Sequence, residues 1–569
     1  MKIPRTAQAT FYDLNLKEQE DEYRHYLYSE AFSLYETNEL HAGIYLGYDS
    51  KRGNVLVRFK VDKTPRRKML FTCFSVPQEY AAPKNWLDLS YHDLRNNAAY
   101  GGLVTDAISV YFSEFSEDPN WIVVGFSKVE LDLIDKLSKG NILIFARHEP
   151  PREYLIALSD LSKRLPVPDA ILDINCEVEN WQPRLLSTKN DIPQTILEEL
   201  DKEDEVIIQG PPGTGKTFLM AQLCASFITQ DKSVIVTALT NRALMELADK
   251  KEHLDLFLKA GKVFKTSLTT DEQNENKYLE RIRDIKAIKG GLILSTYYVL
   301  SQYARNYPDH PVFDIVIIEE ASQAFLGTLA IFRILAKKII IVGDPMQLPP
   351  IWNEGLVRHL HEKIKNVANG LTTFAYFSKA SAFRLTETYR LPERAAKLTG
   401  IFYENTLVSV SNEPPPFKVV LNESLVNPMG GVSFLYLNLY ADGRKPKEAA
   451  NFIEKFLNDF ERDNPTQTLA ILSPFRDTNS FLQSRLYPKC KRLNNIYIET
   501  IDRIQGLTSD FTILLIPFDG INFATNLNRF NVATSRSKSH TLIVLDESFK
   551  KIDVARQGLV KQFFEKANE

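Results

Sequence analysis

Eight residues near the middle of the chain have the types and spacing needed to hold a chain of phosphates. Positions 210–217 match the phosphate-loop pattern, in which glycines let several backbone N–H groups point at one anion. The loop consists of Gly210, Pro211, Pro212, Gly213, Thr214, Gly215, Lys216 and Thr217. The lysine would reach the β- and γ-phosphates, and the hydroxyl of Thr217 would hold Mg²⁺. An apolar strand at 206–208 and a helix at 216–227 are expected on either side.

Two acids follow another apolar run. The strand predicted at Phe313–Ile318 ends at Glu319 and Glu320. Beside a phosphate loop, the first acid would hold Mg²⁺ and the second would polarise the attacking water. A solvated acidic pair at a strand end is the alternative. After the next apolar strand, Gln347 would sense the γ-phosphate and Asp344 would cap a turn, although a simple β-turn would have the same sequence.

The elements that must position these residues form two series of short apolar strands that alternate with helices. Such alternation predicts parallel sheets covered on both faces, and therefore an α/β fold with two tandem RecA-like domains. We expect these domains at 186–384 and 385–569, the first with a small helical insertion at about 250–290. The predicted strands are 206–208, 234–237, 292–295, 313–318, 339–342, 469–472, 497–499, 512–516 and 541–545.

Residues 1–185 have a different pattern, which predicts an N-terminal β-barrel with a helical stalk. Strands are expected at 41–48, 54–61 and 68–75, and helices at 16–34, 129–137 and 151–164. The basic segment 63–68 is either a solvated hairpin tip or a phosphate contact.

Composition narrows the class of protein. A chain of 569 residues with 44% hydrophobic and 25% charged residues is typical of roughly three to four globular domains. The net charge of −3 means that any nucleic-acid surface must be local. The four cysteines form no C-x-x-C pair, which argues against zinc or iron–sulfur modules. The polar N-terminus and the lack of an apolar run of about 20 residues predict a soluble, cytoplasmic protein without membrane contact.

Six motifs in order resemble the superfamily 1 helicases. They are G-P-P-G-T-G-K-T, E-E-A-S-Q, G-D-P-M-Q-L, T-Y-R, I-D-R-I-Q-G and N-V-A-T-S-R, between about 190 and 546. Within branch 1B they are most similar to the group of the nonsense-mediated-decay RNA helicase and the Okazaki-fragment nuclease-helicase. The resemblance is limited to the motor, because the chain lacks cysteines for a zinc domain and has no nuclease signature.

The resemblance also implies roles for individual residues. Gln194 would read the adenine edge and Tyr389 would stack on the base, while Arg390 and Arg536 would neutralise the γ-phosphate. Gln505 and Gly506 would link the nucleotide to the nucleic acid. Contacts to the nucleic-acid strand are expected from Thr240, Asn241, Pro474 and Thr500.

The implied protein is a helicase or translocase that uses ATP and Mg²⁺ and moves 5′→3′ on single-stranded DNA or RNA. We expect a monomer, with a protein partner in a larger nucleic-acid-processing or defence system. Two departures from the family pattern stand out: Glu319 replaces the usual aspartate, and Thr508 stands where many relatives have glutamate. A remodeller of protein–nucleic acid complexes with little unwinding is one alternative, and a helicase fold that only binds is another.

Overall fold

The computed structural model describes residues 2–65, 70–76, 86–96, 103–118, 120–127, 134–135, 137–306, 311–411, 425–426, 429–504, 506–550 and 558–568. The chain divides into two compact units. Unit 1 contains Met1–Lys17, Pro151–Tyr436 and Ile501–Glu569, and unit 2 contains Glu18–Pro150 and Leu437–Thr500. The domain boundaries expected from the sequence stay a prediction.

A nine-stranded sheet forms the centre of unit 1, with strand order β11-β10-β12-β9-β13-β14-β8-β15-β7. Every adjacent pair in it is parallel, as the alternation of strands and helices predicts. Its strands are β7 (Arg184–Leu186), β8 (Glu205–Gln209), β9 (Val234–Ala238), β10 (Val263–Lys265), β11 (Glu280–Arg281), β12 (Leu292–Thr296), β13 (Phe313–Ile318), β14 (Ala336–Gly343) and β15 (Ser381–Leu385).

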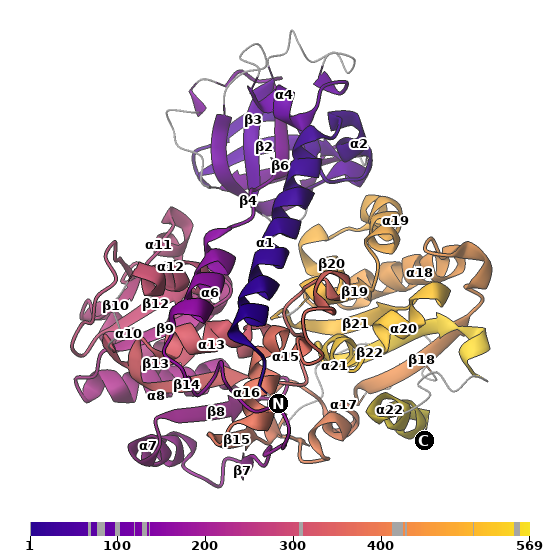
Figure 1. Ribbon diagram of the computed structural model, residues 1–569. Helices are drawn as coiled ribbons and strands as arrows, with labels where there is room; N and C mark the ends of the chain where they lie inside the picture. The colour runs from indigo at the N-terminus through magenta and orange to yellow at the C-terminus, as the bar shows by residue number, and fades with distance from the viewer. Residues whose placement is uncertain are drawn as a thin grey trace. The chain divides into compact units, whose positions relative to one another are not determined.

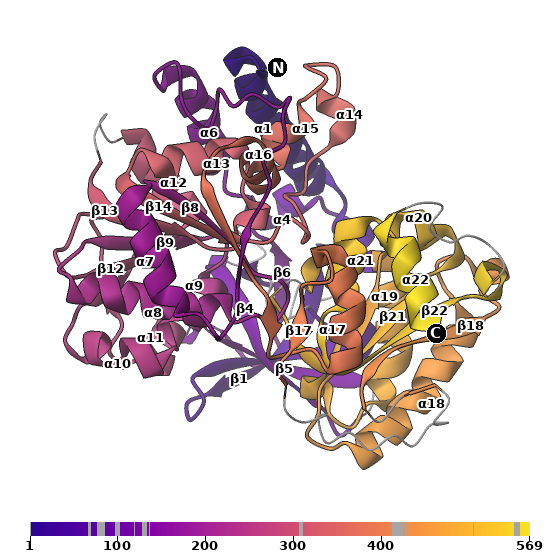
Figure 2. The ribbon, with the colours of Figure 1, turned by 90° about the horizontal axis from the view of Figure 1, so that it is seen from below.

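Both faces of this sheet are buried. Successive residues of a strand point to opposite sides, so one strand contributes to the hydrophobic core on each face. In β8, Ile207 lies in one hydrophobic core, and Val206 and Ile208 lie in the other. Helices α7–α10 cover one face and α12, α13 and α16 cover the opposite face (Figures 1 and 2). These helices are α7 (Ile192–Lys202), α8 (Lys216–Thr229), α9 (Asn241–Ala248), α10 (Lys251–Lys259), α12 (Tyr297–Asn306), α13 (Leu326–Arg333) and α16 (Gly370–Phe377).

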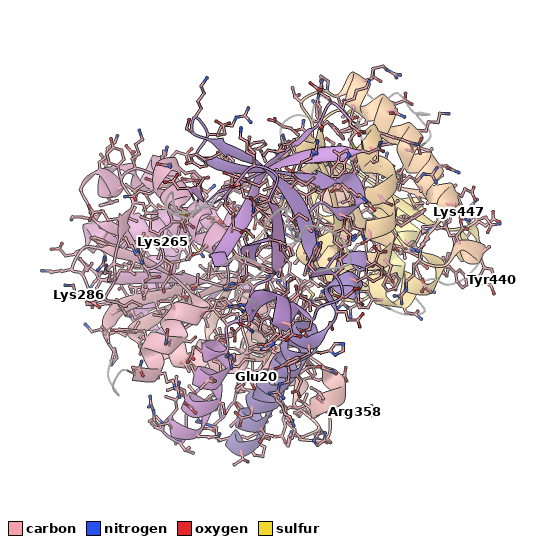
Figure 3. All side chains as sticks on the ribbon, turned by 90° about the horizontal axis from the view of Figure 1, so that it is seen from above. Glu20, Lys265, Lys286, Arg358, Tyr440 and Lys447 are labelled. Carbon is pink, nitrogen blue, oxygen red and sulfur yellow. The ribbon has the colours of Figure 1, made fainter. Side chains whose placement is uncertain are left out.

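The segment at 250–290 differs from the predicted helical insertion. Only α10 and the short α11 (Thr270–Glu275) are helical, and β10 and β11 extend the edge of the parallel sheet. The predicted helical insertion was wrong for this part of the segment because Val263 is buried in the sheet core and Lys265, two residues later in the same strand, bonds to Asn241. Lys265, labelled in Figure 3, is 1% exposed. In the sequence alone, a lysine at this position looks like an exposed residue on the surface of a helix.

Two N-terminal segments pack into unit 1. Helix α1 (Arg5–Tyr28) places Phe11 and Tyr12 against Phe325, and Arg5 forms an ion pair with Asp173 at 2.6 Å. Helix α6 (Glu153–Arg164) confirms the helix expected at 151–164, and its apolar side joins the same hydrophobic core. The helix expected at 129–137 falls largely outside the described residues.

A closed six-stranded barrel forms the first part of unit 2 and confirms the predicted N-terminal barrel. Its order is β1-β2-β5-β4-β3-β6, and the neighbouring strands are antiparallel. The buried rings of Phe126 and Phe145 stack on each other, and the buried ring of Phe59 packs against both at a tilt. The strands are β1 (His41–Asp49), β2 (Asn54–Lys60), β3 (Phe71–Val76), β4 (Leu103–Phe115), β5 (Trp121–Ser127) and β6 (Ile142–Arg147), and the helices α2 (Ala31–Glu36) and α4 (Tyr91–Asn96) accompany them.

The basic segment predicted at 63–68 lies partly outside the described residues. Lys63 does not lie on a solvated tip: it is 8% exposed, and its ammonium group donates to the carbonyl of Tyr35 at 2.9 Å. The ring of Tyr35 also lies under this ammonium group. Lys63 therefore stabilises the barrel and is not presented to solvent.

A second series of strands agrees with the prediction and contains the runs β18-β22-β21 and β19-β20. Strands β21 and β22 pair in parallel, and so do β19 and β20. The strands are β18 (Gly431–Leu437), β19 (Leu469–Ser473), β20 (Ile496–Thr500), β21 (Ser509–Leu515) and β22 (Ser537–Asp546). The helices that follow α16 in the chain are α17 (Glu393–Thr399), α18 (Lys447–Asp463), α19 (Arg476–Leu486), α20 (Ile521–Ala524), α21 (Leu527–Thr534) and α22 (Leu559–Asn568).

The cysteines Cys73, Cys176, Cys224 and Cys490 are all unbonded and buried. Burial raises the pKa of the thiols of Cys73, Cys224 and Cys490. Within the described residues, no helix has both the length and the apolar character that a membrane crossing requires.

Candidate nucleotide site

The phosphate loop connects β8 to α8, as the sequence predicts, and lies in unit 1. Gly213 and Gly215 have φ angles of +75° and +78°, a left-handed conformation that only glycine adopts readily. The ammonium group of Lys216 donates to the carbonyl of Gly210 at 2.5 Å, across the base of the loop. The loop is therefore already curled, with the first turn of α8 available for an anion.

The first acid of the pair faces the loop. The hydroxyl of Thr217 donates to Oε1 of Glu319 at 3.0 Å, while the buried Oε2 of Glu319 has no hydrogen-bond partner in the described structure. Burial, and secondarily the charge of Glu320, raise the pKa of Glu319 well above its usual value. A hard cation with oxygen ligands satisfies both oxygens, so Thr217 and Glu319 fit Mg²⁺ that is completed by phosphates and water.

The second acid sits in a conformation that non-glycine residues rarely adopt. Glu320 has φ 51° and ψ 37°, just beyond the end of β13. Burial is the main cause that raises its pKa, and the charge of Glu246 on α9 adds to it. A Cβ atom built on Gly506 would lie 3.6 Å from Oε1 of Glu320, so the side chain of Glu320 lies close to the backbone of Gly506. Residues held in such conformations cluster at functional sites.

Two arginines converge on the same region from segments far apart in the sequence. Arg536 is 2% exposed, and its Nε donates to the carbonyl of Val532 at 2.8 Å. Arg390 donates from Nη1 to the carbonyl of Ser535 at 3.4 Å. Among the described residues, neither guanidinium forms a salt bridge.

The electrostatics of this region favour an anion. Burial, and then the neighbouring Arg390, lower the pKa of Arg536 to about 9. Burial lowers the pKa of Arg390 as well. The pKa of Lys216 is lowered by burial, and both arginines add to that effect. One buried and two half-buried cations repel one another at this position, and a triphosphate is the kind of ligand that would relieve their repulsion.

The turn after β14 holds the expected γ-phosphate sensor. The side-chain amide of Gln347 donates to Oδ2 of Asp344 at 3.1 Å, and Oδ1 of Asp344 accepts from the backbone N–H of Met346 at 3.1 Å. Asp344 therefore caps the turn, as predicted, and fixes Gln347 at the same time.

The residues expected around the base are more exposed. Tyr389 is 58% exposed, and its backbone N–H donates to the carbonyl of Gly213 at 2.9 Å, which joins it directly to the loop. Gln194 begins α7, where its side-chain amide donates to Glu198 at 2.9 Å. Gln505 lies outside the described residues. The base-reading role of Gln194 and the stacking role of Tyr389 stay predictions.

The expected nucleic-acid contacts lie in both units. In unit 1, Thr240 caps α9 by accepting from the N–H of Ala243 at 3.3 Å, and Oδ1 of Asn241 accepts from the buried Lys265 at 2.8 Å. Because Lys265 occupies Oδ1 of Asn241, the NH₂ of the same amide is the group that can donate to a ligand. In unit 2, Pro474 is buried and Thr500 is 7% exposed. All four contacts stay predictions.

A glycine substitution tests the loop geometry. A Cβ atom on Gly213 would lie 2.4 Å from Cβ of Arg390 and 2.7 Å from Oγ1 of Thr388. We expect Gly213→Ala to push the T-Y-R segment away and to weaken ATP binding at least tenfold, as measured with a fluorescent ATP analogue. The matched control is Gly443→Ala, where φ is +54° but no atom lies within 4 Å. Equal effects of the two substitutions on thermal stability, with ATP affinity retained in both, would contradict this packing.

Several residues of the site lie outside the six motifs, so the sequence pattern does not identify them. Gln209 donates to Oδ1 of Asp344 at 3.1 Å and accepts from Nε of Arg384 at 2.7 Å. Tyr403 donates to Oδ2 of Asp344 at 2.6 Å. One feature of the sequence points to this group of residues. Arg384 is a charged residue inside the apolar segment that forms β15, and a buried arginine needs partners.

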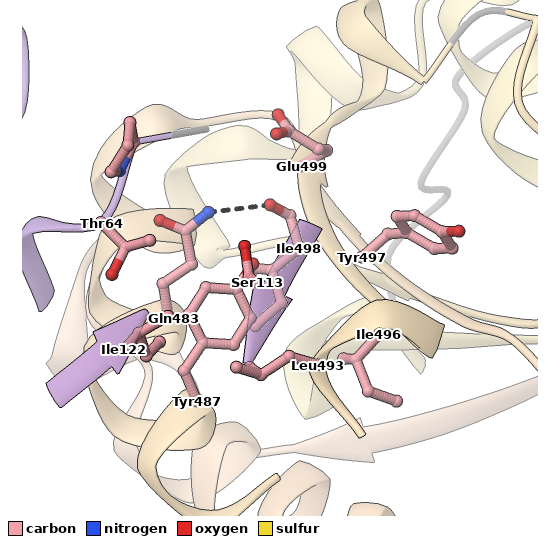
Figure 4. Close-up of a pocket in the computed structure, with 11 residues that line it drawn as sticks. Thr64, Ser113, Ile122, Gln483, Tyr487, Leu493, Ile496, Tyr497, Ile498 and Glu499 are labelled. Atoms are coloured by element: carbon pink, nitrogen blue, oxygen red, sulfur yellow. Dashed lines mark hydrogen bonds between the residues drawn. The ribbon is translucent and has the colours of Figure 1, made fainter. Parts of the chain in front are cut away.

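A separate cavity in unit 2 is too small for a nucleotide. Its volume is about 60 Å³, and it lies between barrel residues such as Ser113 and Ile122 and the α19–β20 region. Gln483 donates to the carbonyl of Ile498 at 2.9 Å along its wall (Figure 4). A space of this size holds only a few water molecules, so this cavity is not a candidate nucleotide site.

Comparison with known proteins gives two family matches, each described as an AAA domain, at residues 194–397 and 372–548. The helicase/nuclease dna2 of Schizosaccharomyces pombe is 23% identical over 82% of this chain and 34% of its own length. The ATP-dependent helicase upf1 of the same organism is 24% identical over 76% of this chain and 51% of its own. Replicase polyprotein 1ab of murine coronavirus (strain 2) is 22% identical over 72% of this chain and 5% of its own.

Among solved structures, the PRRSV helicase aligns with a TM-score of 0.34 and 13% identity, over 80% of this chain and 64% of that chain. This chain spans about half or less of the length of the curated relatives named above. The two AAA-domain matches fall on the segments that carry the six motifs. The chain therefore resembles the superfamily 1 helicases of the group that contains Upf1 and Dna2.

Proposed function

We propose that this chain hydrolyses ATP and couples the hydrolysis to movement along single-stranded nucleic acid, as a helicase or translocase. The observation that carries the proposal is a group of three cations around a curled phosphate loop, Lys216, Arg390 and Arg536, of which Arg536 is buried and the other two are half-buried. Similarity to ATP-dependent helicases supports it.

Each side chain has a defined task in this proposal. Lys216 holds the β- and γ-phosphates, while Arg390 and Arg536 neutralise the charge that grows on the γ-phosphate as it is transferred. Thr217 and Glu319 hold Mg²⁺, which neutralises phosphate charge when it is bound. Glu320 polarises the attacking water and accepts its proton, and its raised pKa makes its carboxylate a stronger base.

The glutamate at position 319 is compatible with activity. Its carboxylate already faces the hydroxyl of Thr217 at 3.0 Å, so the extra methylene group does not remove it from the metal position. With the lysine, both arginines and Glu320 also present, we favour an active motor over a fold that only binds. Thr508 bears on the coupling between the nucleotide and the nucleic acid, and not on hydrolysis itself.

The finer features of the proposal are a 5′→3′ direction, a monomeric state and a protein partner in a nucleic-acid-processing or defence system. The strand is DNA or RNA, because their discrimination depends on contacts to the 2′-OH. Thr240 and Asn241 are the proposed strand contacts in unit 1, since each keeps a hydrogen-bond donor available. A remodeller that displaces proteins would share all of these residues.

The decisive experiment measures steady-state ATPase activity without nucleic acid, with single-stranded DNA and with single-stranded RNA of matched sequence. We expect one polymer to stimulate kcat at least tenfold. Duplexes with a 5′ or a 3′ single-stranded tail then test direction, and a streptavidin-displacement assay in parallel separates unwinding from remodelling. The absence of ATPase activity under all three conditions, despite measurable ATP binding, would favour the binding-only alternative.

A further inference from the structure

We propose that Tyr403 is a positioning residue that links the γ-phosphate sensor to the arginine finger through its hydroxyl group. The proposal rests on the proposed ATPase function and adds a residue that lies outside the six motifs. Tyr403 ends the short 3₁₀ segment Gly400–Tyr403, and its side chain is completely buried.

The first half of the link is the carboxylate of Asp344, which is 1% exposed. Its Oδ2 accepts from the Tyr403 hydroxyl at 2.6 Å and from the side-chain amide of Gln347 at 3.1 Å. Its Oδ1 accepts from Gln209 and from the N–H of Met346, each at 3.1 Å. The orientation of the carboxylate therefore decides where the amide of Gln347 points, and the hydroxyl of Tyr403 is its shortest contact.

The second half of the link is Asn531, the first residue of the N-V-A-T-S-R motif. Its side-chain amide donates to the Tyr403 oxygen and to the carbonyl of Met346, both at 2.8 Å. The carbonyl of Asn531 accepts from the hydroxyl of Ser535 at 2.6 Å, and the carbonyl of Val532 accepts from Arg536 at 2.8 Å. Asn531 thus anchors α21, which ends two residues before Arg536.

The hydroxyl of Tyr403 has one proton and uses it on Asp344, while its oxygen accepts from Asn531. Burial, and then the charge of Asp344, raise the pKa of Tyr403 well above its usual value, so the proton stays in place. The Tyr403 oxygen therefore lies between the turn that carries Gln347 and α21, the helix that precedes Arg536, and it adds to the direct bonds from Asn531 and Asn528 to main-chain carbonyls of that turn. Neither contact involves the phosphate loop, so the link acts on the geometry of transfer and not on ATP binding.

The test is Tyr403→Phe, which keeps the ring and removes only the oxygen. We expect kcat for the nucleic-acid-stimulated ATPase to fall about 10- to 100-fold, the range for losing a hydrogen bond to a charged group, with the KM for ATP within about twofold of wild type. The matched control is Tyr12→Phe, because Tyr12 is also fully buried in unit 1 and its hydroxyl oxygen accepts from the N–H of Gly327 at 2.9 Å. That control is expected to keep kcat within about twofold.

A double-mutant cycle separates positioning from a general loss of stability. Asn531→Ala removes the other end of the same bond and is expected to lower kcat to a similar extent, whereas combining it with Tyr403→Phe adds less than about threefold. If Tyr403→Phe folds poorly, Asn531→Ala alone tests the proposal: its kcat must fall while its KM for ATP stays within about twofold of wild type. Retention of full kcat by either single variant, or multiplicative effects in the double variant, would overturn the proposal. A wild-type protein without ATPase activity would instead refute the proposed function.

Discussion

Lys216→Ala is expected to lower kcat for ATP hydrolysis by about a thousandfold or more, because it removes a phosphate-binding cation from a water-poor site. The variant is expected to fold normally. Lys216 has no salt-bridge partner among the described residues, so its loss removes one hydrogen bond to Gly210 and the attraction to the charge of Asp344, while it also removes repulsion from Arg390 and Arg536. The measurements are steady-state ATPase activity with and without single-stranded nucleic acid, and the thermal midpoint of unfolding.

A surface lysine gives the matched control. Lys259 is paired with Asp255 at 2.6 Å on α10, and Lys259→Ala changes the net charge by the same amount. It is expected to keep wild-type kcat. If Lys216→Ala also kept its ATPase activity, the phosphate-loop assignment would be wrong, however well the remaining motifs fit.

Arg536→Met is expected to have two opposite effects. Hydrolysis should fall about a thousandfold or more, the range for losing an arginine finger. The nucleotide-free protein should become more stable, with Tm raised by roughly 3 °C, because a buried guanidinium near another one is replaced by an apolar side chain of similar length. Differential scanning calorimetry without nucleotide, beside ATPase assays, checks both effects.

The control for stability is a buried arginine that does have partners. Arg384, also 2% exposed, donates to Gln209 at 2.7 Å and to Glu404 at 3.0 Å. Arg384→Met should lower Tm, since it leaves Gln209 without its donor. A lower Tm for Arg536→Met as well would show that Arg536 is held by favourable contacts, and the argument for an anion-binding cation group would fail.

Three motifs around the candidate nucleotide site directly follow strands, so the sequence predicts that they lie together. The carboxyl ends of parallel strands meet at one edge of a sheet, so Gly210 after β8, Glu319 after β13 and Asp344 after β14 must lie close together. That geometric rule needs only the strand positions, and the apolar runs identify these.

The sequence does not predict the residues that connect the motifs. Tyr403 lies in a short 3₁₀ segment with no periodicity, and its hydroxyl matters only because Asp344 and Asn531 face it from distant parts of the chain. The segment around Lys265 was predicted as helix for a related reason. A three-residue strand is too short to show a period, and its sheet neighbours determine its structure.

The buried state of all four cysteines makes this chain a convenient background for site-specific labelling. A thiol introduced on the surface would react with a maleimide dye far faster than the native ones, whose thiolate forms are suppressed by burial. Paired dyes would then report distance changes between chosen parts of the chain without prior removal of native residues. Cys224, on the helix that starts at the phosphate loop, would in turn become reactive only when that helix loosens from its sheet.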